Sequence, residues 1–205
     1  MPESPARTHG APQRTPAANR RRVAALDAFI DLVLEENLPP TPNQVAERAG
    51  ISVATFFRYF ESLNAIRHDA AARMLERFPL MKLTKIGKGT LHERVEAFVA
   101  LRVALWEKLS LLARLQRTLV LQDKDAAKMV DDVRGLMVNQ VREHFAPELR
   151  ELTFAQGDDA VSLIAMLTSV ESWEQFRLTY HRSPLQTRRA WANAIRGILQ
   201  SDSHR

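Results

Sequence analysis

The chain has 205 residues, of which 45% are hydrophobic and 26% are charged, as in a globular protein with one small and one larger domain. It has no cysteine, which excludes disulfides and cysteine-based metal sites. The net charge of +5 is spread unevenly, because residues 1–22 hold five Arg and one Glu, whereas residues 23–80 hold five basic and eight acidic side chains. A nucleic-acid partner must therefore be recognised by an arrangement of side chains rather than by bulk charge.

No segment combines the charged start, apolar run and small-residue cleavage site of a signal peptide. The most apolar run, residues 160–170, is about half as long as a membrane helix needs to be. We therefore expect a cytoplasmic protein with no membrane segment.

Residues 1–19 are rich in Pro, Ala, Ser and Thr, and we expect a disordered arm there. The arm is either a spacer or an extension that adds phosphate or minor-groove contacts to DNA, and the sequence leaves both interpretations open. Arg20, Arg21 and Arg22 follow the arm and are better candidates for DNA contacts. A helix is predicted over residues 21–36, since apolar residues recur at helical spacing before the Pro39–Pro40 pair.

Residues 41–60 predict two short helices joined by a tight turn. Thr41 and Gln44 have the spacing of a capping box, with Pro42 at the first helical position. Gly50 is suited to the left-handed conformation that ends a helix, and Ser52 can cap the next helix, residues 53–60. This pattern is typical of a helix-turn-helix, whose second helix enters the DNA major groove.

A helical wheel divides this second helix into two sides. Val53, Phe56, Phe57 and Phe60 fall on a side that we expect to be core. The other side carries a small residue, a hydroxyl, a guanidinium and a phenol, all suited to bases or phosphates, in Ala54, Thr55, Arg58 and Tyr59. An ordinary helical hairpin with a solvated face is the alternative, but the turn and core positions favour DNA recognition.

The stretch AERAGISVATFFRYFESLNAI resembles the signature of the tetracycline-repressor-like (TetR) family of bacterial transcriptional regulators. The resemblance covers residues 25–70 and is carried by Ala46, Ala49, Gly50, Ile51, Ser52, Ala54, Thr55, Phe56, Tyr59, Phe60, Ser62 and Ile66. The sequence departs from the family at Phe57, where a phosphate-bonding Tyr is usual, and at Leu63, where a phosphate-bonding Lys is usual. The candidate DNA contacts are Arg20, Arg21, Arg22, Thr41, Ser52, Val53, Ala54, Thr55, Phe57, Arg58 and Tyr59.

Further helices are predicted along the rest of the chain, with a loop at residues 79–89, and no strand alternation or repeat stands out. Their expected ranges are 63–77, 90–109, 111–121, 125–145, 158–181 and a last helix capped at 183–186. The fold class is therefore all-α. Residues 20–66 are predicted to form a three-helix helix-turn-helix domain, and residues 67–205 a larger helical domain for ligand binding and dimerisation.

Residues 160–180 carry apolar side chains on more than one side, which calls for two packing partners. One partner can be a second copy of the chain, so we expect a homodimer through the last two helices that binds an inverted-repeat operator in double-stranded DNA. The resemblance implies the same, and a thicker monomer core is the alternative.

The resemblance also implies a cavity for a small-molecule effector in the larger domain. The candidate ligand contacts are Phe98, Arg102, Trp106, Gln116, Trp173 and Phe176. For any one aromatic residue, ordinary core packing is the competing interpretation.

No pattern of catalytic or metal-ligating residues is found, so we expect neither an enzyme nor a cofactor. The sequence predicts a DNA-binding transcriptional regulator, a repressor released from its operator by a small apolar or amphipathic ligand. The alternative is a helix-turn-helix protein that acts without a ligand, through protein partners or non-specific DNA binding.

Overall fold

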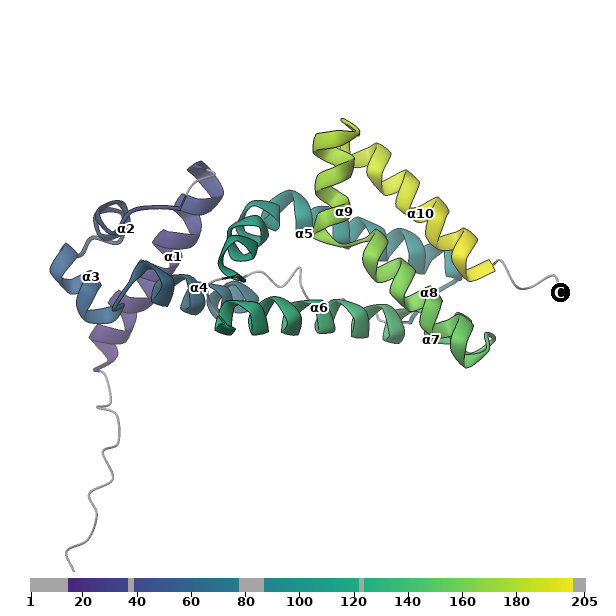
Figure 1. The fold of residues 1–205 in the computed structure, drawn as a ribbon, viewed down its shortest axis with the longest axis horizontal. Helices are drawn as coiled ribbons and strands as arrows, with labels where there is room; N and C mark the ends of the chain where they lie inside the picture. Colours follow the sequence, from purple (N-terminus) through teal and green to yellow (C-terminus); the bar gives the residue numbers. More distant parts are fainter. Residues whose placement is uncertain (1–14, 37–38, 78–86, 122–123, 201–205) are drawn as a thin grey trace, which may run out of the picture.

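The computed structural model describes residues 15–36, 39–77, 87–121 and 124–200, which form helices and no strands. An N-terminal bundle contains α1 (Pro16–Glu36), α2 (Pro42–Arg48), α3 (Val53–Tyr59) and α4 (Leu63–Arg77) (Figure 1). The larger C-terminal domain contains α5 (Leu91–Leu119), α6 (Lys124–His144), α7 (Ala146–Leu149), α8 (Phe154–Leu167), α9 (Val170–Glu174), the π-helical segment η2 (Gln175–Thr179) and α10 (Pro184–Gln200). The predicted all-α class is confirmed.

The caps of the helix-turn-helix form as the sequence predicts. The Thr41 side chain accepts a hydrogen bond from the Gln44 amide while the Gln44 side chain accepts one from the Thr41 amide, which completes the capping box of α2. Gly50 has φ +65°, and the Ile51 amide donates to the Ala46 carbonyl at 2.9 Å. Ser52 accepts from the Thr55 amide at 3.1 Å and caps α3. These local bonds fix the angle between α2 and α3.

Ion pairs connect α1 to α4 along the outside of the N-terminal bundle. The Arg73 guanidinium binds both carboxylate oxygens of Asp27 at 3.0 Å, and Arg77 binds Asp31 at 2.5 Å. Beneath these pairs the two helices share an apolar core with α2 and α3, built from Phe29, Ile30, Val33, Val45, Phe56, Phe60, Ile66 and Ala70.

The N-terminal helix begins five residues before the predicted start. Thr15 caps it by accepting from the Ala18 amide at 3.3 Å, and Pro16 occupies the first helical position, where the missing N–H costs nothing. Residues 16–19, expected in the disordered arm, are therefore helical. The rest of that arm up to residue 14, and the predicted loop up to residue 86, lie outside the described residues.

Two predicted helix boundaries in the larger domain differ from the structure. The segments 90–109 and 111–121 form the single helix α5, because neither Gly nor Pro interrupts Leu91–Leu119. The predicted helix 158–181 begins at Phe154 behind a Thr153 capping box and breaks at Thr168. There the Thr168 hydroxyl donates to the Ile164 carbonyl at 2.8 Å, and Ser169 caps α9.

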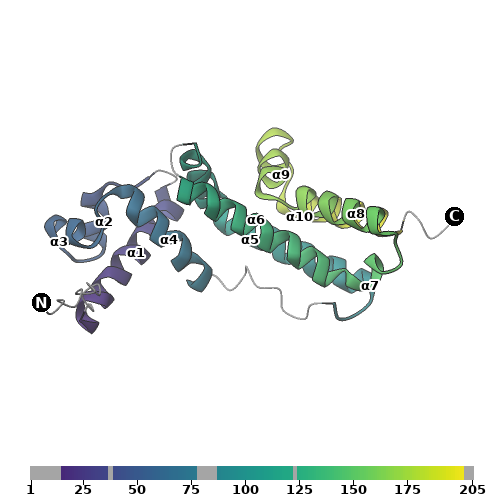
Figure 2. The same ribbon diagram turned by 60° about the horizontal axis from the view of Figure 1, so that its bottom comes forward.

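The long helices α5 and α6 lie side by side and extend away from the N-terminal bundle (Figure 2). Helix α10 packs along α5, and α8 packs on α6 and α10. The core between these helices includes Phe98, Leu105, Leu112, Val141, Ile164, Trp191 and Ile195. Helix α1 contacts α5 directly, and α4, which packs on α1, is joined to α5 by a hydrogen bond from Gln116 to the Arg67 carbonyl.

Candidate functional site

Helix α3 is held by one side and presents the other to solvent. Phe56 is fully buried and Phe60, directly after the helix, is almost so, with their rings 5.4 Å apart. Half-buried Tyr59 also packs against this core. Because the helix has only seven residues, these few anchors are enough to orient it.

The exposed side of α3 is wider than the wheel predicted. Val53 and Phe57, expected in the core, are 37% and 50% exposed, and they lie beside exposed Ala54 and Arg58. Residues three and four positions apart adjoin on a helix, so these four form one continuous strip that we call the α3 strip. The correction arises because Phe56, Phe60 and Tyr59 fill the space beneath this short helix, and Tyr59, expected on the exposed side, is half-buried against the core.

Two polar residues at the start of α3 bind each other. The Ser52 hydroxyl donates to the Thr55 hydroxyl at 2.9 Å, and Thr55 is half-buried. The Arg58 guanidinium lies 5.5 Å from the centre of the Tyr59 ring, and no ion pair holds it among the described residues. The guanidinium is therefore available to a partner outside the chain.

The three arginines at the start of α1 differ in their surroundings. Arg20 and Arg21 are exposed. Arg22 forms an ion pair with Asp69 of α4, and its guanidinium lies 5.3 Å from the centre of the Phe60 ring. Arg22 thus connects α1 to α4, and a DNA contact by Arg22 would have to compete with Asp69. The Thr41 hydroxyl is exposed and is bonded within its capping box.

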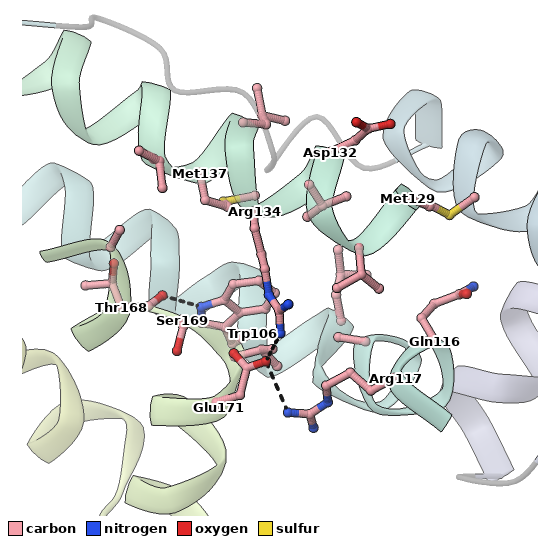
Figure 3. Close-up of a pocket in the computed structure, with 18 of the residues that line it drawn as sticks. Trp106, Gln116, Arg117, Met129, Asp132, Arg134, Met137, Thr168, Ser169 and Glu171 are labelled. Carbon is pink, nitrogen blue, oxygen red and sulfur yellow. Dashed lines mark hydrogen bonds and ion pairs between the residues drawn. The ribbon is translucent and has the colours of Figure 1, made fainter. Parts of the chain in front are cut away.

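A cavity of about 730 Å³ lies among α5, α6 and α8, with α4 and α9 completing its wall (Figure 3). Its volume falls in the range of small-molecule sites. The lining is mostly apolar and includes Met74, Trp106, Leu109, Ala113, Met129, Val130, Val133, Leu136, Met137, Val138, Ala165, Met166 and Val170. Such a wall suits a ligand with an apolar body.

Two predicted ligand contacts line this cavity, and each also makes a hydrogen bond to a neighbouring helix. The Trp106 indole N–H donates to the Thr168 carbonyl at 2.8 Å, directly at the break between α8 and α9. The Gln116 side-chain amide donates to the Arg67 carbonyl of α4 at 3.3 Å. Gln116 therefore contacts both the cavity and the helix that follows α3.

Charged residues also line the cavity wall. Glu171 of α9 binds Arg134 of α6 at 3.1 Å and Arg117 of α5 at 3.5 Å (Figure 3). Burial raises the pKa of Glu171, but hydrogen bonds from its own backbone amide and from Arg134, together with the Arg117 charge, outweigh burial and hold that pKa below its ordinary value. The carboxylate therefore stays ionised and clamps three helices together.

The other four predicted ligand contacts do not line this cavity. Phe98 stacks on His144, while Trp173 and Phe176 pack against Trp191, so these aromatics belong to the core between helices. Arg102 is 1% exposed and bonds to Met137. Sequence reasoning could not separate wall from core, because both place aromatics at helical spacing.

The sequence-based site also omitted polar residues that do line the cavity. Arg117, Arg134 and Thr168 look like ordinary residues of helix surfaces in the sequence. They gather only because α5, α6 and the α8–α9 junction converge. Arg117, Arg134 and Glu171 lie on three helices, and no local spacing brings them together.

Among residues 15–36, 39–77, 87–121 and 124–200, no three acidic or histidine side chains gather as a metal site. Within the same residues, no helix combines the length and apolar character required to cross a bilayer.

Comparison with known proteins shows which solved structures share this fold. No family model and no curated protein matches the sequence. Solved structures do match in three dimensions. A transcriptional regulator from Rhodococcus sp. Rha1 aligns with a TM-score of 0.66 and 17% identity, over 89% of this chain and 96% of its own.

Two further structures share the arrangement. A protein described as a transcriptional regulator from Pseudomonas aeruginosa PAO1 aligns with a TM-score of 0.66 and 17% identity, over 91% of this chain and 93% of its own. Another, from Streptomyces coelicolor A3(2), aligns with a TM-score of 0.56 and 18% identity, over 88% and 99% of the two chains. The chain therefore has the all-α fold of these proteins, a helix-turn-helix bundle joined to a larger helical domain.

Proposed function

We propose that this protein is a sequence-specific DNA-binding transcriptional regulator of the TetR type, a repressor that a small apolar or amphipathic ligand releases from its operator. The observation that carries the proposal is the α3 strip, since a capped, two-turn helix presents Ala54 and Arg58 to solvent from the helix-turn-helix. Arg58 can bind a guanine edge or a phosphate, and Ala54 lets the helix backbone approach the groove.

The apolar groups of the strip add a second kind of contact. Val53 and Phe57 are exposed beside Arg58, and apolar side chains in a major groove contact thymine methyl groups. Exposed Arg20 and Arg21 at the start of α1 can add phosphate contacts, which fix orientation rather than sequence.

A homodimer through α8 and α10 would present two copies of α3 to one operator. Leu163 and Met166 of α8 and Leu185 of α10 are large apolar side chains exposed on the single chain. Twofold pairing would cover such side chains and double the number of bases that are read.

The position of the cavity supports the proposed release by a ligand. Gln116 contacts the cavity and the Arg67 carbonyl, and Met74 of α4 lines the same wall. A ligand that binds best when α4 is displaced would shift the population toward a state in which the two α3 helices no longer fit successive major grooves. DNA affinity would then fall by the ratio of the ligand's affinities for the two states.

The first test is selection of bound sequences from a random DNA pool at near-physiological salt, without any ligand. We expect an enriched inverted repeat, and we expect Arg58→Ala to weaken binding to it by about 1–3 kcal/mol. Weak, uniform and steeply salt-dependent binding would contradict the proposal and favour the non-specific alternative. Folded protein that selects no DNA would point to protein partners instead.

The release step has its own test. Candidate ligands that raise the melting temperature are titrated against the protein–operator complex, and at least one should lower the affinity for the selected repeat. If every bound ligand leaves that affinity unchanged, the protein is a DNA-binding regulator without this release mechanism.

A further inference from the structure

Arg102 is a buried cation without a carboxylate partner among the described residues. Its side chain is 1% exposed, in the middle of α5. One terminal nitrogen donates to the Met137 carbonyl at 3.2 Å, and the other contacts the Met137 sulfur. The guanidinium also lies 4.8 Å from the centre of the Phe98 ring. A thioether is a weak acceptor, so one nitrogen of this deeply buried guanidinium lacks a strong hydrogen-bond acceptor.

The neighbouring polar groups do not neutralise this charge. Arg94 is paired with Glu148, and His144 bonds to the Arg94 carbonyl at 2.9 Å. Burial lowers the pKa of His144, and the charges of Arg94 and Arg102 lower it further. Burial also lowers the pKa of Arg102 to about 10, which still leaves the guanidinium charged at neutral pH.

Arg102 lies directly behind the cavity wall. The residues of α5 that line the cavity are Trp106, Leu109, Ala113, Gln116 and Arg117, a single helical stripe. Arg102 is one turn before Trp106 on that stripe. Met137, whose sulfur and carbonyl the guanidinium contacts, itself lines the cavity. One flexible side chain therefore touches both the cavity and the buried charge.

We infer that the ligand of this cavity carries a carboxylate at the end of an apolar body, and that this carboxylate replaces the Met137 sulfur as the partner of Arg102. The inference rests on the proposed ligand-binding function and names its chemical class. Methionine changes rotamer easily, so the sulfur can turn aside while the Met137 carbonyl keeps its hydrogen bond. A guanidinium and a carboxylate form a strong paired contact where water is excluded.

The energetics favour an anion over a neutral polar head. Arg102 already loses its hydration when the chain folds. The only desolvation cost on binding is therefore that of the incoming carboxylate. An uncharged head would leave the buried charge uncompensated. The other cations of the wall, Arg117 and Arg134, already bind Glu171, and are therefore weaker candidates for the head.

The test compares decanoate with decanamide, which have the same length and nearly the same shape but differ in charge. Binding to the full-length protein is followed by tryptophan fluorescence, since Trp106 lines the cavity. We expect decanoate to bind at least about tenfold more tightly than decanamide. In Arg102→Met the two should bind within about threefold of each other, because the variant keeps the apolar volume and removes the charge.

Arg134→Gln is the matched control and should keep the preference for decanoate. Equal binding of both probes to the wild-type protein would overturn the anionic head while leaving an apolar cavity. Loss of the preference in Arg134→Gln would overturn the role of Arg102, and binding of neither probe would overturn the inference as a whole. These outcomes are decided in the wild-type protein and Arg134→Gln even if Arg102→Met does not fold. Operator selection needs no ligand, so it tests the proposed DNA binding separately.

Discussion

Phe57 is an exposed ring on the surface proposed to face DNA. It is 50% exposed and touches the Phe56 ring edge-on, with the ring centres 5.3 Å apart. Its para position carries no hydroxyl, at the place where the family signature that residues 46–66 resemble usually has a phosphate-bonding Tyr. Phe57→Tyr adds that hydroxyl without filling any buried space. We expect operator affinity to rise by about 1.5 kcal/mol, roughly tenfold, as measured by fluorescence anisotropy on the selected repeat.

The salt dependence separates this contact from a charged one. A phenol neutralises no phosphate, so Phe57→Tyr should leave the slope of log affinity against log salt unchanged. Leu63→Lys is the contrasting variant, because it adds a cation at the start of α4 and should steepen the slope by about 0.9 per half-site. Leu63 is half-buried against the core, and a Lys stem can keep that apolar contact. Tighter binding of Phe57→Leu, which has no hydroxyl, would contradict the phosphate contact.

At the scale of elements, the turn between α2 and α3 depends on Gly50. Its φ of +65° lies in the left-handed region, and an added Cβ would meet nothing within 4 Å. The cost of Gly50→Ala is therefore conformational rather than steric, about 1–2 kcal/mol. We expect that loss in the free energy of unfolding of the N-terminal bundle, measured by urea denaturation. DNA affinity should fall as well, since the turn sets the direction of α3.

Gly135 supplies the matched control for this backbone argument. It lies within α6 with ordinary helical geometry and open space around the position of a Cβ. Gly135→Ala should therefore stabilise the protein by about 0.5–1 kcal/mol. The two substitutions add the same methyl group and should change the free energy of unfolding in opposite directions. Stabilisation by Gly50→Ala would mean that the turn relaxes to a right-handed conformation.

The parts of the fold that the sequence predicts are those determined by hydrogen bonds between residues a few positions apart. The caps at Thr41, Ser52 and Thr90 can be read from a few adjacent residues, and the structure forms each of them. The Thr15–Pro16 start of α1 carries a signal of the same kind, and the prediction overlooked it. The break at Thr168 is different, because its carbonyl accepts from Trp106, 62 residues earlier. Ser169 is a local cap signal at this break, but nothing in the sequence around Thr168 indicates the contact with Trp106.

The site follows the same division between local and long-range contacts. The α3 strip lies on one short helix, and the sequence correctly predicted that Ala54 and Arg58 are exposed. It misjudged Val53 and Phe57, which are exposed, and Thr55 and Tyr59, which are half-buried. The cavity lies among five helices. Which side chains line it depends on which others pack into the core between those helices. Phe98 and Trp173 have the same chemistry as Trp106 and pack elsewhere. Only tertiary packing distinguishes them.

At the scale of the whole molecule, the two ends of the folded protein have different surfaces. Helix α3 lies at one end of the molecule and α8 and α10 at the other (Figure 1). The N-terminal bundle presents the α3 strip, whereas α8, η2 and α10 carry large exposed apolar side chains. Leu163, Leu178 and Leu185 are 46%, 58% and 75% exposed on the single chain. An inverted-repeat operator requires two α3 helices at a fixed separation, about one helical turn of DNA or 34 Å. Pairing at the far end would fix that separation.

This pairing predicts that Leu163→Glu converts the dimer to a monomer. Twofold symmetry places the substituted Glu in the interface twice, so the free energy of dimer association should weaken by about 2–6 kcal/mol. Sedimentation equilibrium measures the change, since the chain has a mass of 23.3 kDa and the dimer twice that. Leu121→Glu is the control, because Leu121 is equally apolar and also exposed but lies two residues after α5, outside α8 and α10, and should not affect assembly. The monomer should keep its helix content but bind the inverted repeat no better than a single half-site. A Leu163→Glu dimer of unchanged stability would move the interface away from α8, and a wild-type monomer that binds the full repeat tightly would remove the need for one.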